Sequence, residues 1–261
     1  MSSLLKRYGP WAVVAGASEG IGAAFASALA QAGFGLVLIA RRSAPLEILA
    51  TDLRTRFGST VEILALDLAA PDLQQQFETL AREREIGLVV YNAALSIVAP
   101  FLTTPLAAKL RMVDINVRGP LLAAHVFGTH MAARGRGGIV LLSSLTAFWG
   151  SAWVATYGAT KAFNLALGEA LAHELAERDV DVLVSCAGAT RTPGFIELMR
   201  GRTAPRSMTP EAVAEQTLHA LPRRGAFVPG AFNRMAQQLL ARALPRSAAV
   251  RIMAGQTKSL L

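Results

Sequence analysis

Residues 16–22 of the chain are Gly-Ala-Ser-Glu-Gly-Ile-Gly, and they separate a short apolar run, residues 11–15, from an alanine-rich stretch, residues 21–33. The apolar run is typical of a buried strand, and the alanine-rich stretch is typical of a helix. Glycines allow a tight turn and close approach of the backbone to a ligand, and the first turn of a helix presents unpaired N–H groups to a phosphate. Three glycines alone are weak evidence, because glycines are common in turns. Their position between a first strand and a first helix predicts a phosphate-binding loop.

The rest of the chain repeats this alternation of strand and helix. Further strand-like segments, most of whose residues are apolar, occur at 35–40, 61–66, 88–91, 139–142 and 180–185, and helical stretches at 44–57 and 72–85 separate the earlier ones. Runs that are apolar at every position indicate strands covered on both faces. Strands separated by amphipathic helices indicate right-handed βαβ units in a parallel sheet. We therefore predict a doubly wound α/β fold, a Rossmann-type parallel sheet sandwiched by helices, with ligands at the carboxyl ends of the strands.

Length and composition agree with one folded domain. The 261 residues are 52% hydrophobic and only 17% charged, which excludes a disordered chain. We predict a single domain over residues 1–261 with its core at about 9–193. The one cysteine, Cys186, excludes a disulfide framework, and no cysteine or histidine cluster has the spacing of a metal site. A reducing, cytoplasmic setting is expected, and the first residues contain no apolar run long enough for a secretory signal.

Charge and hydropathy argue against two other classes of protein. The chain has 26 Lys and Arg against 18 Asp and Glu, a formal charge of +8, but the arginines are scattered and no nucleic-acid motif accompanies them. No charged residue occurs between Arg136 and Lys161, which is the length of a membrane span. That stretch contains several glycines and serines, so a buried strand, a polar loop and a helix start fit it better. We predict neither nucleic-acid binding nor a transmembrane span.

The end of the second predicted strand bears on the choice of nucleotide. Arg41 and Arg42 follow this strand, whereas a site for NAD would have a carboxylate here to bind the ribose 2′-hydroxyl. The nearest acid is Glu47, which lies inside the next helix. Two guanidinium groups can hold a 2′-phosphate bidentately. A solvated strand end with two ordinary arginines is the alternative, but the glycine loop upstream favours NADP(H) over NAD(H).

Tyr157 and Lys161 form the most informative pair in the chain. Four positions apart, they lie on one face of a predicted helix that follows Ser143-Ser144. A free tyrosine has a pKa of about 10, and a shift of roughly three units toward neutral pH takes about 4 kcal/mol. One cation at about 4 Å in an effective dielectric of about 20 supplies an energy of that order. Lys161 is therefore expected to lower the pKa of Tyr157 enough for acid–base catalysis, although such pairs also arise by chance on amphipathic helices.

The chain carries a series of motifs in a fixed order: the glycine loop at 16–22, Asn92-Ala93, Asn116, Ser144 and the Tyr157–Lys161 pair. In order and spacing they resemble the motifs of the short-chain dehydrogenase/reductase family, over about residues 9–193. The resemblance implies that Ser144 hydrogen-bonds the substrate carbonyl oxygen and that Tyr157 donates a proton to it. It also implies that Lys161 holds the nicotinamide ribose and that Asn116 positions a water that relays protons to Lys161.

The resemblance also implies a set of cofactor contacts. Asp67, with Leu68 beside it, matches the residue that meets the adenine, and Thr192 matches the threonine near the nicotinamide end. The cofactor-binding residues implied in this way are Gly16, Ser18, Glu19, Gly20, Ile21, Gly22, Arg41, Arg42, Asp67, Leu68, Asn92, Ala93, Tyr157, Lys161, Gly188, Thr190 and Thr192. Departures from the family pattern fall at framework positions: Tyr91-Asn92-Ala93-Ala94 replaces Asn-Asn-Ala-Gly, Ala187-Gly188 replaces Pro-Gly, and Ala15 replaces a threonine. They affect the expected loop geometry and leave the reactive residues intact.

The implied activity is that of an NAD(P)-dependent oxidoreductase acting on CH–OH groups. We expect an NADPH-dependent reductase of a ketone or aldehyde on an apolar substrate, 3-oxoacyl compounds included. Substrate contacts are expected from Ser144, Tyr157 and Phe195, the last within a substrate loop at about 189–210. Oxidation of an alcohol by the same residues and a non-catalytic NADP-binding sensor are the alternatives. A serine hydrolase is set aside, because no Gly-x-Ser-x-Gly elbow surrounds Ser143 or Ser144.

Three further features concern the substrate and the assembly. Phe148, Trp149 and Trp153 serve either the substrate or helix packing. The C-terminal segment at about 231–261 has apolar residues at helical spacing, for which a core-packing helix is expected in preference to a substrate lid or a membrane-surface helix. Helices at about 106–133 and 155–177 are richer in alanine and leucine than one sheet face requires. Because the family uses these helices as interfaces, a homodimer or homotetramer is expected.

Overall fold

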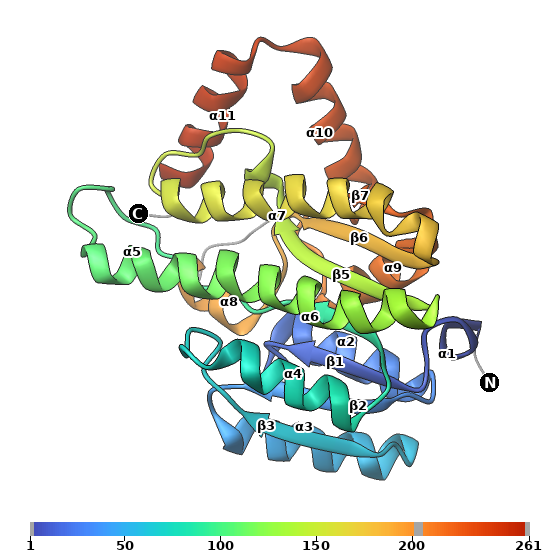
Figure 1. Ribbon diagram of the computed structural model, residues 1–261. Coiled ribbons are helices and arrows are strands. Elements are labelled where there is room, and N and C mark those ends of the chain that lie inside the picture. Colours follow the sequence, from blue (N-terminus) through green and yellow to red (C-terminus); the bar gives the residue numbers. More distant parts are fainter. Residues whose placement is uncertain (1–2, 201–205, 259–261) are drawn as a thin grey trace.

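The computed structural model describes residues 3–200 and 206–258. Within them, seven parallel strands form one sheet in the order β3-β2-β1-β4-β5-β6-β7 (Figure 1). The strands are β1 Trp11–Ala15, β2 Gly35–Ala40, β3 Val61–Ala65, β4 Ile86–Tyr91, β5 Gly137–Ser144, β6 Val180–Ala187 and β7 Gly225–Phe227. The predicted Rossmann-type fold in a single α/β domain is confirmed.

Helices connect these strands on both sides. They are α1 Ser3–Tyr8, α2 Gly20–Gln31, α3 Ser43–Phe57, α4 Leu73–Glu83, α5 Leu106–Val113, η1 Asp114–Arg118, α6 Gly119–Arg134, η2 Leu145–Ala147, α7 Ala155–Glu174, η3 Ala176–Arg178, α8 Pro193–Met199, α9 Pro210–Ala220, η4 Leu221–Arg223, α10 Ala231–Ala243 and α11 Arg246–Lys258. Residues 201–205 of the expected substrate loop and 259–261 of the expected C-terminal segment lie outside the described residues.

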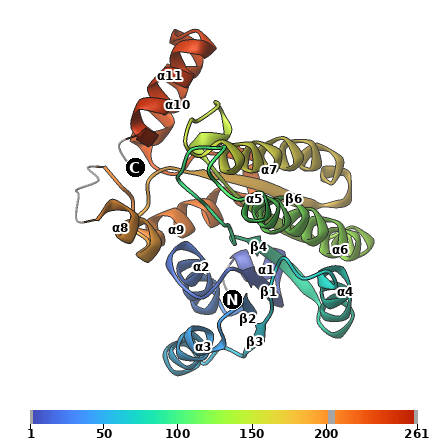
Figure 2. The ribbon, with the colours of Figure 1, turned by 90° about the vertical axis from the view of Figure 1, so that its left-hand side faces the viewer.

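Two apolar layers explain why the central strands carry apolar residues on both faces. On β1, Ala12 and Val14 belong to a buried cluster with residues of α2, α3 and α9, whereas Val13 and Ala15 belong to a second cluster with residues of α4, α6 and α7. Figure 2 shows α2 and α3 on one side of the sheet and α4 and α6 on the other. Each central strand therefore buries both of its faces, as expected for a parallel sheet.

The sequence does not predict β7, because a three-residue strand shows no periodicity. The strand forms through its partner: Gly225 pairs with Leu183, and Phe227 pairs with Ser185 of β6. It begins directly after Arg224, which has a positive φ of 58°. Tertiary contacts, rather than local propensity, place this edge of the sheet.

A buried carboxylate joins three segments that are distant in the sequence. Asp181 of β6 is fully buried and accepts hydrogen bonds from Arg7 at 2.8 Å, from the hydroxyl of Tyr8 at 2.5 Å and from Arg224 at 2.5 Å. Burial, followed by the contact with this carboxylate, raises the pKa of Tyr8. The cluster attaches α1 and the residue that precedes β7 to the amino-terminal end of β6.

Replacing Asp181 by alanine should lower the free energy of unfolding by about 2 kcal/mol, because the Tyr8 hydroxyl loses its partner in the core. The same change at Asp52, whose ion pair with Arg56 is exposed, should cost less than about 0.5 kcal/mol. Urea unfolding of the two variants measures the difference. Equal losses would show that the Asp181 cluster does not stabilise the fold.

The C-terminal segment differs from the expected core-packing helix. Helices α10 and α11 form a hairpin that projects from the body of the protein (Figures 1 and 2). α10 contributes no buried residue, and Phe232, Met235 and Leu239 remain 43%, 60% and 62% exposed. The prediction is wrong for α10, where Leu240 is partly buried against the cluster of Trp149, Ala249 and Met253 but the rest of the apolar stripe stays exposed, whereas α11 buries Ala249 and Met253 in that cluster. Within the described part of the chain, no helix is both long and apolar enough to cross a membrane.

Candidate active site

The glycine loop connects the carboxyl end of β1 to the start of α2. Gly16 and Gly20 have φ angles of 83° and 57°, in the left-handed region that favours glycine. A side chain at Gly22 would collide with the carbonyl oxygen of Gly16, to which the Asn92 amide donates at 2.9 Å. The side chain of Glu19 makes no capping hydrogen bond to α2, so the first-turn N–H groups have no side-chain cap. This turn fits a pyrophosphate, and Ser18, Ile21 and Ala93 belong to it or pack against it.

Arg41 and Arg42 follow β2, where the sequence predicts the 2′-phosphate of NADP. Both residues are exposed, and Arg42 forms an ion pair with Glu19 at 3.2 Å. Arg41 is near enough to Asp67 to contribute to lowering the pKa of that carboxyl. The two guanidinium groups therefore lie at the corner of the sheet where the glycine loop and the loop after β3 meet.

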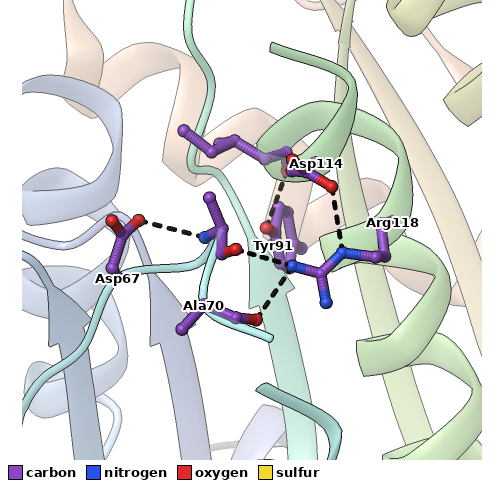
Figure 3. Close-up of polar contacts among 7 residues, drawn as sticks. Asp67, Ala70, Tyr91, Asp114 and Arg118 are labelled. Carbon is purple, nitrogen blue, oxygen red and sulfur yellow. Dashed lines mark hydrogen bonds and ion pairs between the residues drawn. The ribbon is translucent and has the colours of Figure 1, made fainter. Parts of the chain in front are cut away.

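The loop after β3 carries Asp67 and Leu68, the expected adenine contacts. One carboxylate oxygen of Asp67 accepts from the Ala69 N–H at 3.0 Å, and the other accepts from the Arg111 guanidinium at 2.7 Å. Burial raises the pKa of Asp67, but these hydrogen bonds outweigh it and hold the pKa below its ordinary value. Figure 3 shows that this loop faces η1. The carboxylate is thus ionised and fixed in place.

Ser144 ends β5, and α7 carries Tyr157 and Lys161 one turn apart. The Ser144 hydroxyl lies near enough to the Tyr157 phenol to affect its pKa, and the Ser144 hydroxyl oxygen accepts from the Thr146 N–H at 3.2 Å. The Nζ of Lys161 lies 5.6 Å from the centre of the Tyr157 ring and donates to the Leu142 carbonyl at 2.8 Å. The three predicted catalytic side chains therefore lie together at the carboxyl end of β5.

Burial governs how these side chains titrate. It raises the pKa of Tyr157, and the nearby Ser144 hydroxyl offsets that rise only in part. It lowers the pKa of Lys161 to about 8. The expected lowering of the tyrosine pKa by Lys161 is therefore wrong for this structure. Loss of water around the phenol raises its pKa, and the Lys161 ammonium directs its own hydrogen bond to the Leu142 carbonyl.

Asn116 lies in η1, a single π-helical turn between α5 and α6, and it is fully buried. Its side-chain oxygen accepts from the Leu95 N–H at 2.8 Å, and its amide donates to the Leu95 carbonyl at 2.9 Å and to Thr160 at 3.1 Å. Thr160 belongs to α7 and donates to the carbonyl of Tyr157 at 2.7 Å. Asn116 is thus joined to the catalytic helix, at a π-turn of the kind often found at functional sites.

The expected nicotinamide end follows β6. Thr190 donates to the Gly188 carbonyl at 3.0 Å, and Thr192 caps α8 by accepting from the Phe195 N–H at 3.2 Å. Thr192 also lies against Gly20, which brings α8 to the glycine loop. Phe195 is half-buried in the first turn of α8. The elements that would enclose a dinucleotide from its phosphates to its nicotinamide therefore all lie at the carboxyl ends of the strands.

Comparison with known proteins agrees with this geometry. The profile of the short chain dehydrogenases matches residues 10–202. The chain belongs to the short-chain dehydrogenase family. A 7beta-hydroxysteroid dehydrogenase of Mediterraneibacter gnavus is 29% identical over 237 residues, 89% of this chain and 90% of that protein.

Two solved structures are similar to this short-chain dehydrogenase over most of its length. A structure described for the stereoselectivity of 7beta-hydroxysteroid dehydrogenase has a TM-score of 0.89 at 28% identity and covers 97% of this chain and 99% of its own. A short-chain dehydrogenase from Sphingobium yanoikuyae in complex with NADPH has a TM-score of 0.80 at 30% identity, and the match covers 90% of this chain and 93% of that chain. The protein is an oxidoreductase acting on carbonyl or alcohol substrates.

Three residues near the site of this short-chain dehydrogenase could not be identified from the sequence. Thr160 joins Asn116 to α7, Arg118 bonds to the loop after β3, and Asn233 of α10 packs its amide against Gly188. The one sequence signal is proximity, since Thr160 and Arg118 lie within three residues of predicted catalytic positions. Asn233 has no such signal. Among the described residues, no cluster of three His, Cys, Asp or Glu side chains could hold a metal ion.

Proposed function

We propose that the enzyme reduces a ketone or aldehyde on a bulky apolar substrate with NADPH. The observation that carries this proposal is the convergence of Ser144, Tyr157 and buried Lys161 at the carboxyl end of β5, together with a glycine loop before a helix, α2, that has no side-chain cap. Ser144 would hydrogen-bond the substrate oxygen and Tyr157 would donate a proton to it. Lys161 would hold the nicotinamide ribose, and Asn116 would support the catalytic helix through Thr160 and position the water that relays protons to Lys161. NADPH, when bound, supplies the hydride.

NADPH is preferred in this proposal because of the groups that end β2. Arg41 and Arg42 offer two guanidinium groups to a 2′-phosphate, and the position that would need a carboxylate for a ribose hydroxyl is basic. Arg42 already has an anionic partner in Glu19 at 3.2 Å, which shows that this guanidinium can reach the glycine loop. A 2′-phosphate would compete with Glu19 for it.

A bulky apolar substrate is supported by the surface beyond α8. The Arg206 guanidinium lies 4.3 Å from the centre of the Phe232 ring, and the Asn233 amide lies 3.6 Å from the sulfur of Met208. These contacts bring the start of α10 against the expected substrate loop. Phe232, Met235 and Leu239 of α10, which are exposed, then offer an apolar surface that starts at this contact. An apolar ligand would gain free energy by covering it.

The test is NADPH oxidation, followed by absorbance, with a panel of carbonyl compounds. A bulky ketone such as a steroid ketone should give a lower KM than a small polar ketone, and NADH should replace NADPH only at much higher concentration. Oxidation of the matching alcohol with NADP+ measures the reverse direction. No turnover with any carbonyl compound, together with tight NADPH binding, would favour a cofactor-binding sensor instead.

The assembly proposed for the enzyme is a homodimer or homotetramer in the cytoplasm, where a single free cysteine stays reduced. An apolar stripe runs along α5 and α6, where Leu106, Leu110, Val113 and Leu121 are exposed by 67%, 56%, 39% and 44%. A second copy could cover this stripe. Light scattering of the eluted protein should give a multiple of 27.6 kDa, and a monomer alone would contradict the assembly.

A further inference from the structure

Arg118 joins the two ends of the site that the proposed function uses. It is the last residue of η1, two positions after Asn116. One terminal nitrogen of its guanidinium donates to the carbonyls of Ala69 and Ala70, each at 2.8 Å, while its Nε donates to Asp114 at 3.1 Å (Figure 3). The guanidinium therefore spans from the π-turn to the loop after β3.

This loop is the segment that would meet the adenine. Both backbone polar groups of Ala69 are hydrogen-bonded: its N–H donates to the Asp67 carboxylate at 3.0 Å, and its carbonyl accepts from Arg118. The Ala70 N–H donates to the Asp67 backbone carbonyl at 2.9 Å, and the Ala70 carbonyl accepts only a longer bond, 3.3 Å from the Leu73 N–H, besides that from Arg118. Arg118 thus holds the turn that directs the Asp67 carboxylate.

The π-turn that carries Arg118 is itself held in place. The hydroxyl of buried Tyr91, at the end of β4, donates to the Ile115 carbonyl at 2.8 Å (Figure 3). The side chain of Asn116 is bound on the other side to Leu95 and Thr160. Arg118 therefore extends from a rigid support, and a charge-assisted hydrogen bond from such a support fixes a loop more firmly than a neutral one.

We propose that Arg118 is a positioning residue for the adenosine end of the cofactor. Its two hydrogen bonds hold the turn at 67–70 in the conformation that receives the adenine, so that binding does not have to order the loop. The inference rests on the proposed use of a dinucleotide, and it adds a role that does not touch the reacting atoms. Loss of Arg118 should weaken binding of the adenosine half and leave the nicotinamide half unaffected.

The experiment separates the two halves of the cofactor with full-length protein. Titration calorimetry with 2′,5′-ADP and with nicotinamide mononucleotide should show that Arg118→Gln weakens 2′,5′-ADP about tenfold and leaves the mononucleotide within twofold. Arg118→Lys, which keeps a charged donor, should recover part of the loss. The matched control is Arg82→Gln, which removes an arginine from an exposed ion pair of α4 and should change neither ligand. With saturating NADPH, kcat of Arg118→Gln should stay within twofold of the wild type.

Each outcome has a distinct meaning. If the wild type does not bind 2′,5′-ADP, the proposed cofactor is wrong and the inference is overturned with it. If the wild type binds and Arg118→Gln binds equally well, or loses both ligands equally, the positioning role alone is overturned. Should Arg118→Gln fail to fold, Asp114→Asn removes the anion that orients the guanidinium and should weaken 2′,5′-ADP about threefold. An unchanged affinity in that variant would also refute the role.

Discussion

Replacing Tyr157 by phenylalanine should reduce kcat for carbonyl reduction by about a thousandfold while leaving the dissociation constant for NADPH within about twofold. The substitution removes one oxygen atom, the proton donor next to Ser144, and keeps the ring beside Lys161. Steady-state NADPH oxidation gives the loss in kcat, and quenching of protein fluorescence gives the affinity. General acid catalysis by a positioned side chain accounts for a loss of this size.

Tyr8→Phe provides the matched control. It removes a tyrosine hydroxyl at the opposite end of the sheet, where the group donates to Asp181. We expect lower stability and an unchanged kcat for this variant, the reverse of the pattern for Tyr157→Phe. Full activity in Tyr157→Phe would remove this residue from the mechanism.

The double variant Arg41→Ser/Arg42→Ser should weaken NADPH about a hundredfold and leave NADH within about threefold. Two guanidinium groups that hold a phosphate contribute charge-assisted hydrogen bonds of about 1.5–3 kcal/mol each, part of which is returned when water replaces them. NADH has no 2′-phosphate and loses none of these contacts. Dissociation constants for both nucleotides, measured by the same fluorescence titration, give the comparison.

An Arg56→Ser/Arg82→Ser variant controls for the loss of two positive charges. Both arginines form exposed ion pairs within their own helices, α3 and α4. This variant should bind both nucleotides as the wild type does, apart from a small salt-dependent change. If Arg41→Ser/Arg42→Ser weakened the binding of NADPH and of NADH equally, these residues would shape the site without binding the 2′-phosphate.

The strands of the sheet could be predicted because each is marked by the pattern of its own residues. Six strands are largely apolar runs, with Glu62 in β3 and Asp181 in β6 as the charged exceptions, and each is separated from the next by a segment with a different pattern. The helix expected at 106–133 is in fact divided by the π-turn at Asp114–Arg118, for which the sequence has no signature. The Asp181 cluster could not be predicted either, because its partner Arg7 lies 174 residues away in the sequence.

The site could be predicted in its chemistry and only partly in its electrostatics. Ser144, Tyr157 and Lys161 lie within 18 residues on two adjacent elements, so strand and helix geometry brings them together. The direction in which the Tyr157 pKa shifts depends on how far the phenol is removed from water. That burial follows from tertiary packing, which cannot be predicted from the local sequence. Arg118 was missed for the same reason, since its acceptors are backbone carbonyls of a distant loop.

The central claim is that this site passes a hydride from NADPH to a carbonyl carbon. The most direct measurement is mass spectrometry of the alcohol formed from a bulky ketone with NADPH that carries two deuterium atoms at C4. We predict one deuterium at the carbinol carbon in the wild-type product and about a thousandfold slower formation of that product with Tyr157→Phe. An alcohol without deuterium at that carbon would contradict the claim.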